Sequence, residues 1–254
     1  MSRSLMFAFT VFNHAMFLAV YAVFMLFVGG IDLLPKTIDG PETYALALAL
    51  PVNIGLLALF GVQHSVMARP AFKRWWTRFV PRQIERSVYV LITNVLLILI
   101  MAAWMPMGPV VWDPQSPIVR GLLWGLFAVG WLIVPAATLM TSHFDLFGTR
   151  QGWLHLKKKP YEPLPFKVRG FYRLVRHPLY VGWIIAFFAI PTMTAGHLLF
   201  ATLMTTYILI AIRFEERDLT NHFGDKYTEY KRSVRGLIPR LGSAPTMGAG
   251  APAV

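Results

Sequence analysis

Long apolar stretches alternate along this chain with shorter segments that hold nearly all of its charged residues. The apolar runs cover residues 5–28, 43–62, 87–105, 119–141, 178–190 and 196–212. A helix needs about 20 apolar residues to cross the hydrocarbon core of a bilayer, so the first four runs predict four transmembrane helices. The last two runs are shorter, and Pro191 and Gly196 mark a turn between them. We therefore expect residues 178–212 to form a C-terminal helical hairpin, which need not reach the far side of the membrane.

The composition is that of a membrane protein rather than a soluble domain. Of the 254 residues, 56% are hydrophobic and 14% are charged, whereas soluble domains carry about 25% charged residues. The expected fold class is an all-α integral membrane protein with a single transmembrane domain over residues 1–240. Residues 241–254 are rich in Gly, Ala and Pro and are expected to form a disordered tail. The chain has no cysteine, which excludes disulfides, thiolate metal sites and a cysteine nucleophile.

Lysine and arginine residues are concentrated in alternate segments. The segments 63–86, 142–177 and 213–254 hold six, eight and seven of them, whereas the loops 29–42 and 106–118 together hold only Lys36. Under the positive-inside rule the three basic segments face the cytosol, which places both termini there. This topology accounts for the net charge of +12 and suits an anionic lipid surface. Because the basic residues adjoin membrane segments, no nucleic-acid partner is expected.

Ionisable side chains are costly at membrane depth and usually serve a function there. His64, His143 and His177 each stand at the predicted cytosolic end of a different apolar run. The charged groups that follow the hairpin at the same level are Arg213, Glu215 and Glu216. Since a hairpin returns its ends to one place, we expect these groups to line one cavity that opens to the cytosol. Their chemistry is that of a small-molecule site.

Each of these residues also has a simpler structural interpretation. Arg176 could serve only as an anchor whose charged end reaches the membrane interface. One of the two glutamates could pair with Arg213 or Arg217 at helical spacing. His14, within the first run, could be an interior histidine, and Asp145 could pair with a nearby lysine. The argument for a site therefore rests on the joint pattern.

Two further stretches make the chain resemble a known superfamily. Residues 170–182 read Gly-Phe-Tyr-Arg-Leu-Val-Arg-His-Pro-Leu-Tyr-Val-Gly, and after the hairpin come the glutamate pair and, at 223–230, Phe-Gly-Asp-Lys-Tyr-Thr-Glu-Tyr. This combination resembles the isoprenylcysteine carboxyl methyltransferase superfamily of integral membrane enzymes. Residues 63–69, Gln-His-Ser-Val-Met-Ala-Arg, and 144–151, Phe-Asp-Leu-Phe-Gly-Thr-Arg-Gln, are similar to its bacterial branch of methanethiol S-methyltransferases and NnrU-type proteins. The resemblance covers about residues 5–240.

The resemblance implies S-adenosylmethionine (SAM) as cosubstrate, without a metal, bound over about residues 142–235. Arg176 and His177 would hold its carboxylate by charge-assisted hydrogen bonds. Glu216, in preference to Glu215, would hold ribose hydroxyls or the amino group. The full set of residues implied for SAM binding is Tyr172, Arg176, His177, Pro178, Tyr180, Gly182, Arg213, Glu215 and Glu216. The glycine-rich motif of the soluble dinucleotide-binding fold is absent from the sequence.

The implied reaction is S-methylation of methanethiol to dimethyl sulfide, with S-adenosylhomocysteine as the second product. A base would favour the thiolate, which is the better nucleophile. His64 is the first candidate for this base and His143 the second, with Asp145 available to orient it. A small apolar pocket with Asn53, Gln63 and His64 would receive the thiol. Alternatives are another small-molecule or carboxyl methyltransferase of the superfamily, a reductase on a similar scaffold, or a non-enzymatic NnrU-type membrane protein. Oligomeric state is left open.

Overall fold

Helices make up most of the chain in this computed structural model, which describes residues 1–41 and 43–239. Five helices are long and apolar enough to cross a membrane: α1 (Arg3–Val28), α2 (Leu46–Ala68), α4 (Glu85–Ala103), α5 (Pro117–Thr141) and α9 (Ala195–Phe223). A sixth apolar helix, α8 (Pro178–Phe188), has 11 residues. The all-α membrane fold and the helical hairpin of α8 and α9 agree with the sequence prediction. The predicted tail, 241–254, lies outside the described residues.

Short elements occupy the segments between the long helices. Four of them are helices: α3 (Pro70–Trp76), α6 (His143–Leu146), α7 (Thr149–Leu156) and α10 (Asp225–Ser233). A 3-10 turn, η1 (Gly170–Arg173), precedes α8. Strands β1 (Val110–Trp112) and β2 (Met193–Thr194) pair in antiparallel fashion, with Val110 opposite Thr194. Strand β2 lies in the hairpin turn predicted at 191–196, so this turn is tied to the loop between α4 and α5.

Two predicted boundaries are wrong in the same direction. Helix α2 continues beyond the apolar run that ends at residue 62 and includes His64, and α9 continues beyond residue 212 and includes Glu215 and Glu216. Hydropathy marks where a helix leaves the hydrocarbon core, whereas helical hydrogen bonding continues as long as the residues permit it. The candidate site residues therefore lie on rigid helical turns rather than in loops.

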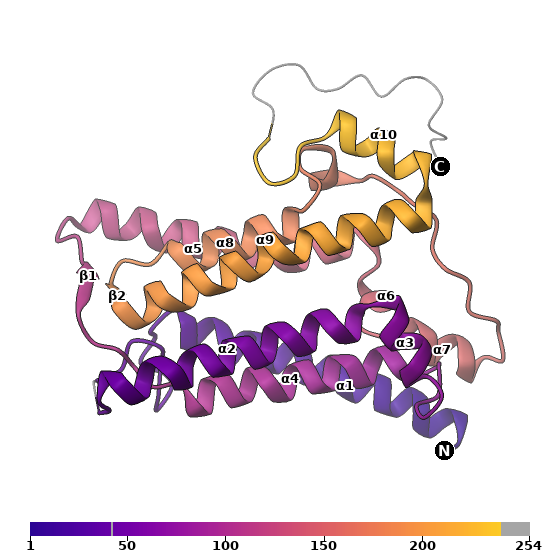
Figure 1. Ribbon diagram of the computed structural model, residues 1–254, viewed down its shortest axis with the longest axis horizontal. Coiled ribbons are helices and arrows are strands. Elements are labelled where there is room, and N and C mark those ends of the chain that lie inside the picture. The colour runs from indigo at the N-terminus through magenta and orange to yellow at the C-terminus, as the bar shows by residue number, and fades with distance from the viewer. Residues whose placement is uncertain (42, 240–254) are drawn as a thin grey trace.

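The long helices form two layers (Figure 1). Helices α1, α2 and α4 pack together in one layer, α5, α8 and α9 form the other, and α2 contacts α9 between them. Within the second layer, α5 and α8 approach so closely that a Cβ on Gly130 would lie 2.8 Å from the carbonyl oxygen of Gly182. Small residues permit such close backbone contact, and van der Waals packing of this kind drives helix association in membranes.

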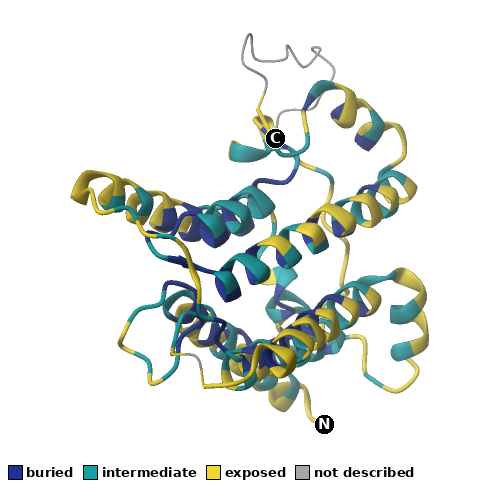
Figure 2. Cartoon of the chain, turned by 60° about the vertical axis from the view of Figure 1, so that its left-hand side comes forward, coloured by how far each residue is buried: buried dark blue, intermediate teal, exposed yellow. Residues whose placement is uncertain are grey.

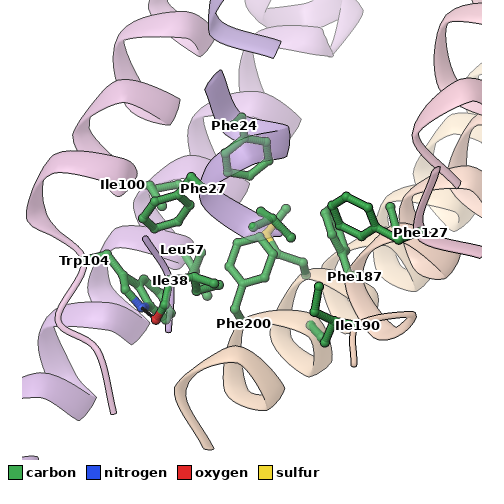
Figure 3. Close-up of a cluster of buried hydrophobic side chains, with 14 of the residues drawn as sticks. Phe24, Phe27, Ile38, Leu57, Ile100, Trp104, Phe127, Phe187, Ile190 and Phe200 are labelled. Carbon is green, nitrogen blue, oxygen red and sulfur yellow. Dashed lines mark hydrogen bonds between the residues drawn. The ribbon is translucent and has the colours of Figure 1, made fainter. Parts of the chain in front are cut away.

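The apolar core joins the two layers. Figure 3 shows Phe200 of α9 between Phe27 and Trp104 of one layer and Phe187 of the other, and all four side chains are buried. The outward faces are exposed although they are apolar: Leu132 on α5 is 67% exposed (Figure 2). Large exposed aliphatic side chains on these helices are the residues that contact lipid.

The bundle has two chemically different ends. One end, which we call the sheet end, holds β1, β2 and the loops 29–45 and 104–116. The other, the basic end, brings together the segments 63–86, 142–177 and 213–239. At the basic end Arg69 donates to the Asp218 carboxylate at 2.8 Å, and Tyr230 donates to the carbonyl oxygen of Tyr172 at 2.7 Å. The prediction that these three segments meet at one place is confirmed.

Candidate active site

The start of α8 is clamped to the end of α9 by the carboxylate of Glu216. Its Oε1 accepts from Arg176 Nε at 2.8 Å and from His177 Nε2 at 3.0 Å, and its Oε2 pairs with Lys231 Nζ at 3.0 Å. The guanidinium of Arg176 also donates to the carbonyl oxygens of Lys231 and Val234. The predicted meeting of Arg176 and His177 with the glutamate pair is therefore confirmed. The clamp also holds the segment after α10 against the start of α8.

The clamp leaves Glu216 and Arg176 little capacity for a ligand. Both Glu216 oxygens are engaged, and the side chains of Arg176 and Glu216 are only 14% and 11% exposed. Buried charges of this kind are stable when each has its partners in place. Within this structure Glu216 is therefore less available to a ligand than Glu215. The Arg176 and His177 donors that face Glu216 are engaged in the same clamp.

Glu215 has a different environment from its neighbour. Successive residues on an α-helix are rotated by about 100°, so the two carboxylates point in different directions. Glu215 Oε2 accepts from the Tyr180 hydroxyl at 2.8 Å and lies 3.9 Å from His177 Nδ1. Its other oxygen has no protein partner among the described residues, and its side chain is 41% exposed. Glu215 is therefore the carboxylate that can accept hydrogen bonds from a ligand.

The start of α8 fixes the position of Tyr180. Pro178 occupies the first turn, where its missing N–H is no loss, and the His177 ring stacks on Tyr180 with centroids 5.6 Å apart. Gly182 does not face the same space, because a Cβ there would lie 2.8 Å from the carbonyl oxygen of Gly130. The glycine allows α5 and α8 to pack closely and so sets the position of Tyr180. The expectation that Gly182 permits a close approach of helices is confirmed.

Arg213 and Tyr172, also implied for SAM binding, lie differently with respect to Glu215. Arg213 precedes Glu215 by two residues, which rotates it by about 200° to the opposite face of α9. It is exposed there and lines a groove together with Glu216. Tyr172 lies in η1, and its carbonyl oxygen accepts from Tyr230. Burial raises the pKa of the Tyr172 hydroxyl to about 12, so it remains a neutral hydrogen-bond donor.

His64 lies on the last turns of α2, facing α4. Its Nδ1 is 3.3 Å from Thr93 Oγ1, and the Thr93 hydroxyl donates its own proton to the carbonyl oxygen of Tyr89 at 3.0 Å. The threonine oxygen must therefore accept from His64 Nδ1–H, which leaves a lone pair on Nε2 of the neutral ring. Nε2 has no partner among the residues that the structure describes. This tautomer is the one that a general base at Nε2 requires.

Aromatic side chains surround His64. Phe60 stacks on the imidazole with centroids 5.2 Å apart, and the Tyr89 ring is 5.0 Å away. The ring centroid of Tyr207 of α9 lies 6.2 Å from that of Phe60, and the Tyr207 hydroxyl oxygen lies 3.5 Å from Ser65 Oγ. The charge of Glu215 acts on the hydroxyls of both Tyr89 and Tyr207, so the two halves of the site are neighbours. Thr93, Tyr89 and Tyr207 carry no sequence motif that would have identified them.

His143 belongs to a different hydrogen-bonded chain, together with His14. The Thr138 hydroxyl donates to the carbonyl oxygen of Pro135, so it accepts from His143 Nδ1 at 2.7 Å. His143 Nε2 then accepts from His14 Nε2 at 3.0 Å, and His14 Nδ1 accepts from Thr149 at 3.1 Å. Both nitrogens of His143 are engaged. Burial also lowers the pKa of its ring, consistent with two neutral imidazoles.

Two further candidate residues are engaged by partners within the protein. The Asp145 carboxylate accepts from Arg150 at 3.0 Å and from Tyr161 at 3.1 Å, so it does not orient His143. Asn53, fully buried, bonds both the N–H and the carbonyl oxygen of Met105 at 3.0 and 2.7 Å. It lies eleven residues before His64, about 16 Å along the helix, and holds the end of α4. Asn53 and His64 therefore lie at different depths in the bundle.

Gln63 stands next to His64 and is only partly satisfied. Its amide donates to the Met67 sulfur at 3.0 Å, whereas its buried Oε1 has no hydrogen-bond partner among the described residues. A buried amide oxygen without a partner is uncommon in folded proteins. Gln63 therefore retains capacity for one donor.

Comparison with known proteins places this geometry in a family. A family model described as NnrU protein matches residues 52–244. The chain belongs to this family. The matched region contains His64, α8 and the glutamate pair. No solved structure matches the chain.

Several relatives match the chain over most of its length. A methanethiol S-methyltransferase from Mycobacterium tuberculosis is 47% identical over 94% of this chain and 98% of its own length. Another, from Crocosphaera subtropica, is 46% identical over 95% of this chain and 94% of its own length. Nurim from Sus scrofa is 32% identical over 75% of this chain and 76% of its own length.

Proposed function

We propose that the protein transfers a methyl group from SAM to methanethiol, giving dimethyl sulfide and S-adenosylhomocysteine. The observation that carries the proposal is the identity of 46–47% over nearly the full chain with relatives named for that activity. The geometry of the basic end supports it, because a base with a free lone pair and a carboxylate with a free oxygen lie on neighbouring helices. The proposed site combines His64 of α2 with Tyr180 of α8 and Glu215 of α9.

The residues around Glu215 fit a SAM molecule. The ribose hydroxyls and the ammonium group of SAM are hydrogen-bond donors, and Glu215 Oε1 is an acceptor without a protein partner among the described residues. Tyr180 fixes the other oxygen of that carboxylate at 2.8 Å and keeps it oriented. Tyr89 and Tyr207 present aromatic rings, which favour a positively charged group near their faces. When bound, SAM supplies an electrophilic methyl group on a positively charged sulfur.

His64 is the proposed general base. Its Nε2 accepts the thiol proton, the thiol sulfur forms a bond to the methyl carbon, and the bond from that carbon to the sulfonium sulfur breaks. Thr93 holds the ring in the tautomer that makes Nε2 the acceptor. Positioned bases of this kind contribute about 10²–10⁴-fold to a rate. His143, whose two nitrogens are engaged, is assigned to structure instead.

The surroundings of His64 favour a small apolar thiol. Phe60 and Tyr89 both lie about 5 Å from the imidazole, as ring centroids. Methanethiol offers only one methyl group and one sulfur for recognition, so shape must supply the selectivity. A thiol with a longer chain would have to displace packed rings. Gln63 Oε1, adjacent to His64, is an additional acceptor for the S–H group.

We further propose that the basic end faces the cytosol of a cell inner membrane. The three basic segments lie together there, whereas the loops at the sheet end hold one lysine, Lys36. This is the asymmetry that orients membrane proteins. SAM and its product would then exchange directly with the cytosol.

The function is tested by incubating purified protein in detergent with methanethiol and SAM carrying a labelled methyl group. The expected result is labelled dimethyl sulfide in amounts equal to S-adenosylhomocysteine, and no methylation of a farnesylated cysteine. Methylation of the farnesylated compound without dimethyl sulfide would assign a carboxyl methyltransferase activity instead. No binding of SAM in calorimetry would favour the non-enzymatic alternative.

A further inference from the structure

A groove on the outer face of α9 is separate from the proposed methyl-transfer site. It has a volume of about 370 Å³ and lies between the end of α9 and helix α10. Its lining residues are Arg213, Glu216, Arg217, Thr220, Asn221 and Lys231. Arg213 and Thr220 project about 160° and about 140° from Glu215 around the helix axis. The groove therefore opens away from the Tyr180 hydroxyl and from His64.

The groove is strongly basic. Glu216 is its only carboxylate, and it is already bound by Arg176, His177 and Lys231. The guanidinium groups of Arg213 and Arg217 are exposed and have no hydrogen-bond or ion-pair partner among the described residues. They stand four residues apart on α9, so they are neighbours on one face. Each guanidinium presents the fork of N–H donors that binds phosphate oxygens.

The helix surface that leads into the groove is apolar. Leu209 and Ile210, each 48% exposed, lie one turn before Arg213. Leu209 and Arg213 are four residues apart and so share a face of α9. Along this face, lipid-exposed aliphatic side chains are followed directly by the two arginines. A molecule that fits both the aliphatic side chains and the arginines has an acyl chain joined to an anionic headgroup.

We propose that the groove binds the headgroup of an anionic phospholipid from the leaflet at the basic end. The phosphate lies between Arg213 and Arg217, with Asn221 as a neutral polar neighbour, and an acyl chain lies along Leu209 and Ile210. A soluble phosphate ester would satisfy the arginines equally but would leave the aliphatic stripe unused. The lipid is therefore distinguished from the ester by its chain.

The test is a lipid titration of purified full-length protein in detergent, followed by native mass spectrometry. Short-chain phosphatidylglycerol, phosphatidylcholine of equal chain length, and glycerol phosphate are added separately. We expect phosphatidylglycerol to bind tightest. Because each arginine near an anionic lipid contributes about fivefold in affinity, the Arg213→Gln/Arg217→Gln double variant should lose about 25-fold. The Arg213→Lys/Arg217→Lys variant should retain most of the binding.

The matched control is Arg74→Gln/Arg78→Gln, two exposed arginines at the same spacing and the same end but outside the groove. It should retain phosphatidylglycerol binding. Equal losses in both double variants would overturn the site, because general charge would then explain the affinity. Glycerol phosphate binding as tightly as phosphatidylglycerol would also overturn it. So would a loss of SAM affinity in the groove variant with unchanged lipid binding, since the groove would then belong to the cosubstrate.

Discussion

The sheet end and the basic end contain similar polar groups but use them differently. At the sheet end, His197 is fully buried and lies between two acceptors, the Asp39 carboxylate at 2.9 Å and the carbonyl oxygen of Phe187 at 3.1 Å. The imidazole therefore links Asp39 to the last turn of α8. Thr194 donates to the other Asp39 oxygen and accepts from the His197 backbone N–H. Every group in this set has its partners.

At the basic end, two groups of the same chemical types each retain one free atom. Glu215 has an oxygen and His64 has a nitrogen without a protein partner among the described residues. The Glu215 side chain is 41% exposed, so a ligand can reach its open position, and titratable groups with open positions of this kind are candidates for a functional site. The comparison teaches that residue type does not separate structural from functional histidines and carboxylates in this fold. The difference lies in whether the protein itself fills each hydrogen-bonding position.

The largest effect on stability should come from removing the histidine of the sheet end. His197→Ala leaves the Asp39 carboxylate, whose side chain is 13% exposed, without its imidazole partner. Loss of one member of a buried pair costs about 3–5 kcal/mol. Unfolding in detergent, followed by circular dichroism, should show this loss. His222→Ala, an exposed histidine of α9, is the control and should change stability little. Equal stability of the two variants would contradict the structural role of His197.

The glutamate pair offers a second way to sharpen the comparison. Glu215→Gln should weaken SAM binding about tenfold to a hundredfold, the range for losing a hydrogen bond to a charged group, with little change in melting temperature. Glu216→Gln should instead lower the melting temperature, because Arg176, His177 and Lys231 lose their common partner. Calorimetry and thermal unfolding on both variants measure the two quantities. The reverse pattern would return the ligand role to Glu216.

Substrate length tests the packing around His64. Ethanethiol adds one methylene, which must fit among Phe60 and Tyr89. One methylene changes discrimination by about 1–3 kcal/mol, so kcat/KM should fall about tenfold or more relative to methanethiol. Competition between the two thiols in one reaction, analysed by gas chromatography, gives the ratio. A ratio near one would show that the pocket is wider than these rings indicate.

The smallest expected effect is a pH dependence from His143. Burial lowers the pKa of its ring below the usual 6.5. The unfolded chain therefore takes up a proton on this residue more readily than the folded protein, and the free energy of unfolding should fall as the pH falls below 6.5. His143→Gln should flatten that slope. Unfolding curves at pH 5, 6, 7 and 8 would detect the change, and identical slopes would exclude this contribution.

The sequence predicted what hydropathy and chain connectivity control. Apolar runs located the long apolar helices and the helical hairpin, and the hairpin implied that Arg176 and His177 would meet the glutamate pair. The basic segments were placed together by charge alone. These features depend on distance along the chain and on water-to-lipid preference, which can both be read from the sequence.

The sequence could not predict how each helix is rotated about its axis, and so which of its side chains face the site. Whether Glu215 or Glu216 faces the site depends on how α9 packs against α2 and α8. Asn53 was predicted to lie in the thiol pocket with His64, but its side chain binds the backbone of Met105. The pairs His14–His143 and Asp39–His197 join residues 129 and 158 positions apart. Such contacts depend on the assembled bundle rather than on a local pattern.

The central claim is that the free Nε2 of His64 is the general base and that His143 is not. The direct measurement is the single-turnover rate of dimethyl sulfide formation with saturating SAM, made in parallel for His64→Gln, His143→Gln and the unaltered protein. The account predicts that His64→Gln loses about 10²–10⁴-fold, keeps its SAM affinity, and partly recovers at alkaline pH, where more of the thiol is ionised. His143→Gln should remain within a few fold of the unaltered protein. An unaltered rate in His64→Gln, or the large loss in His143→Gln, would contradict the account.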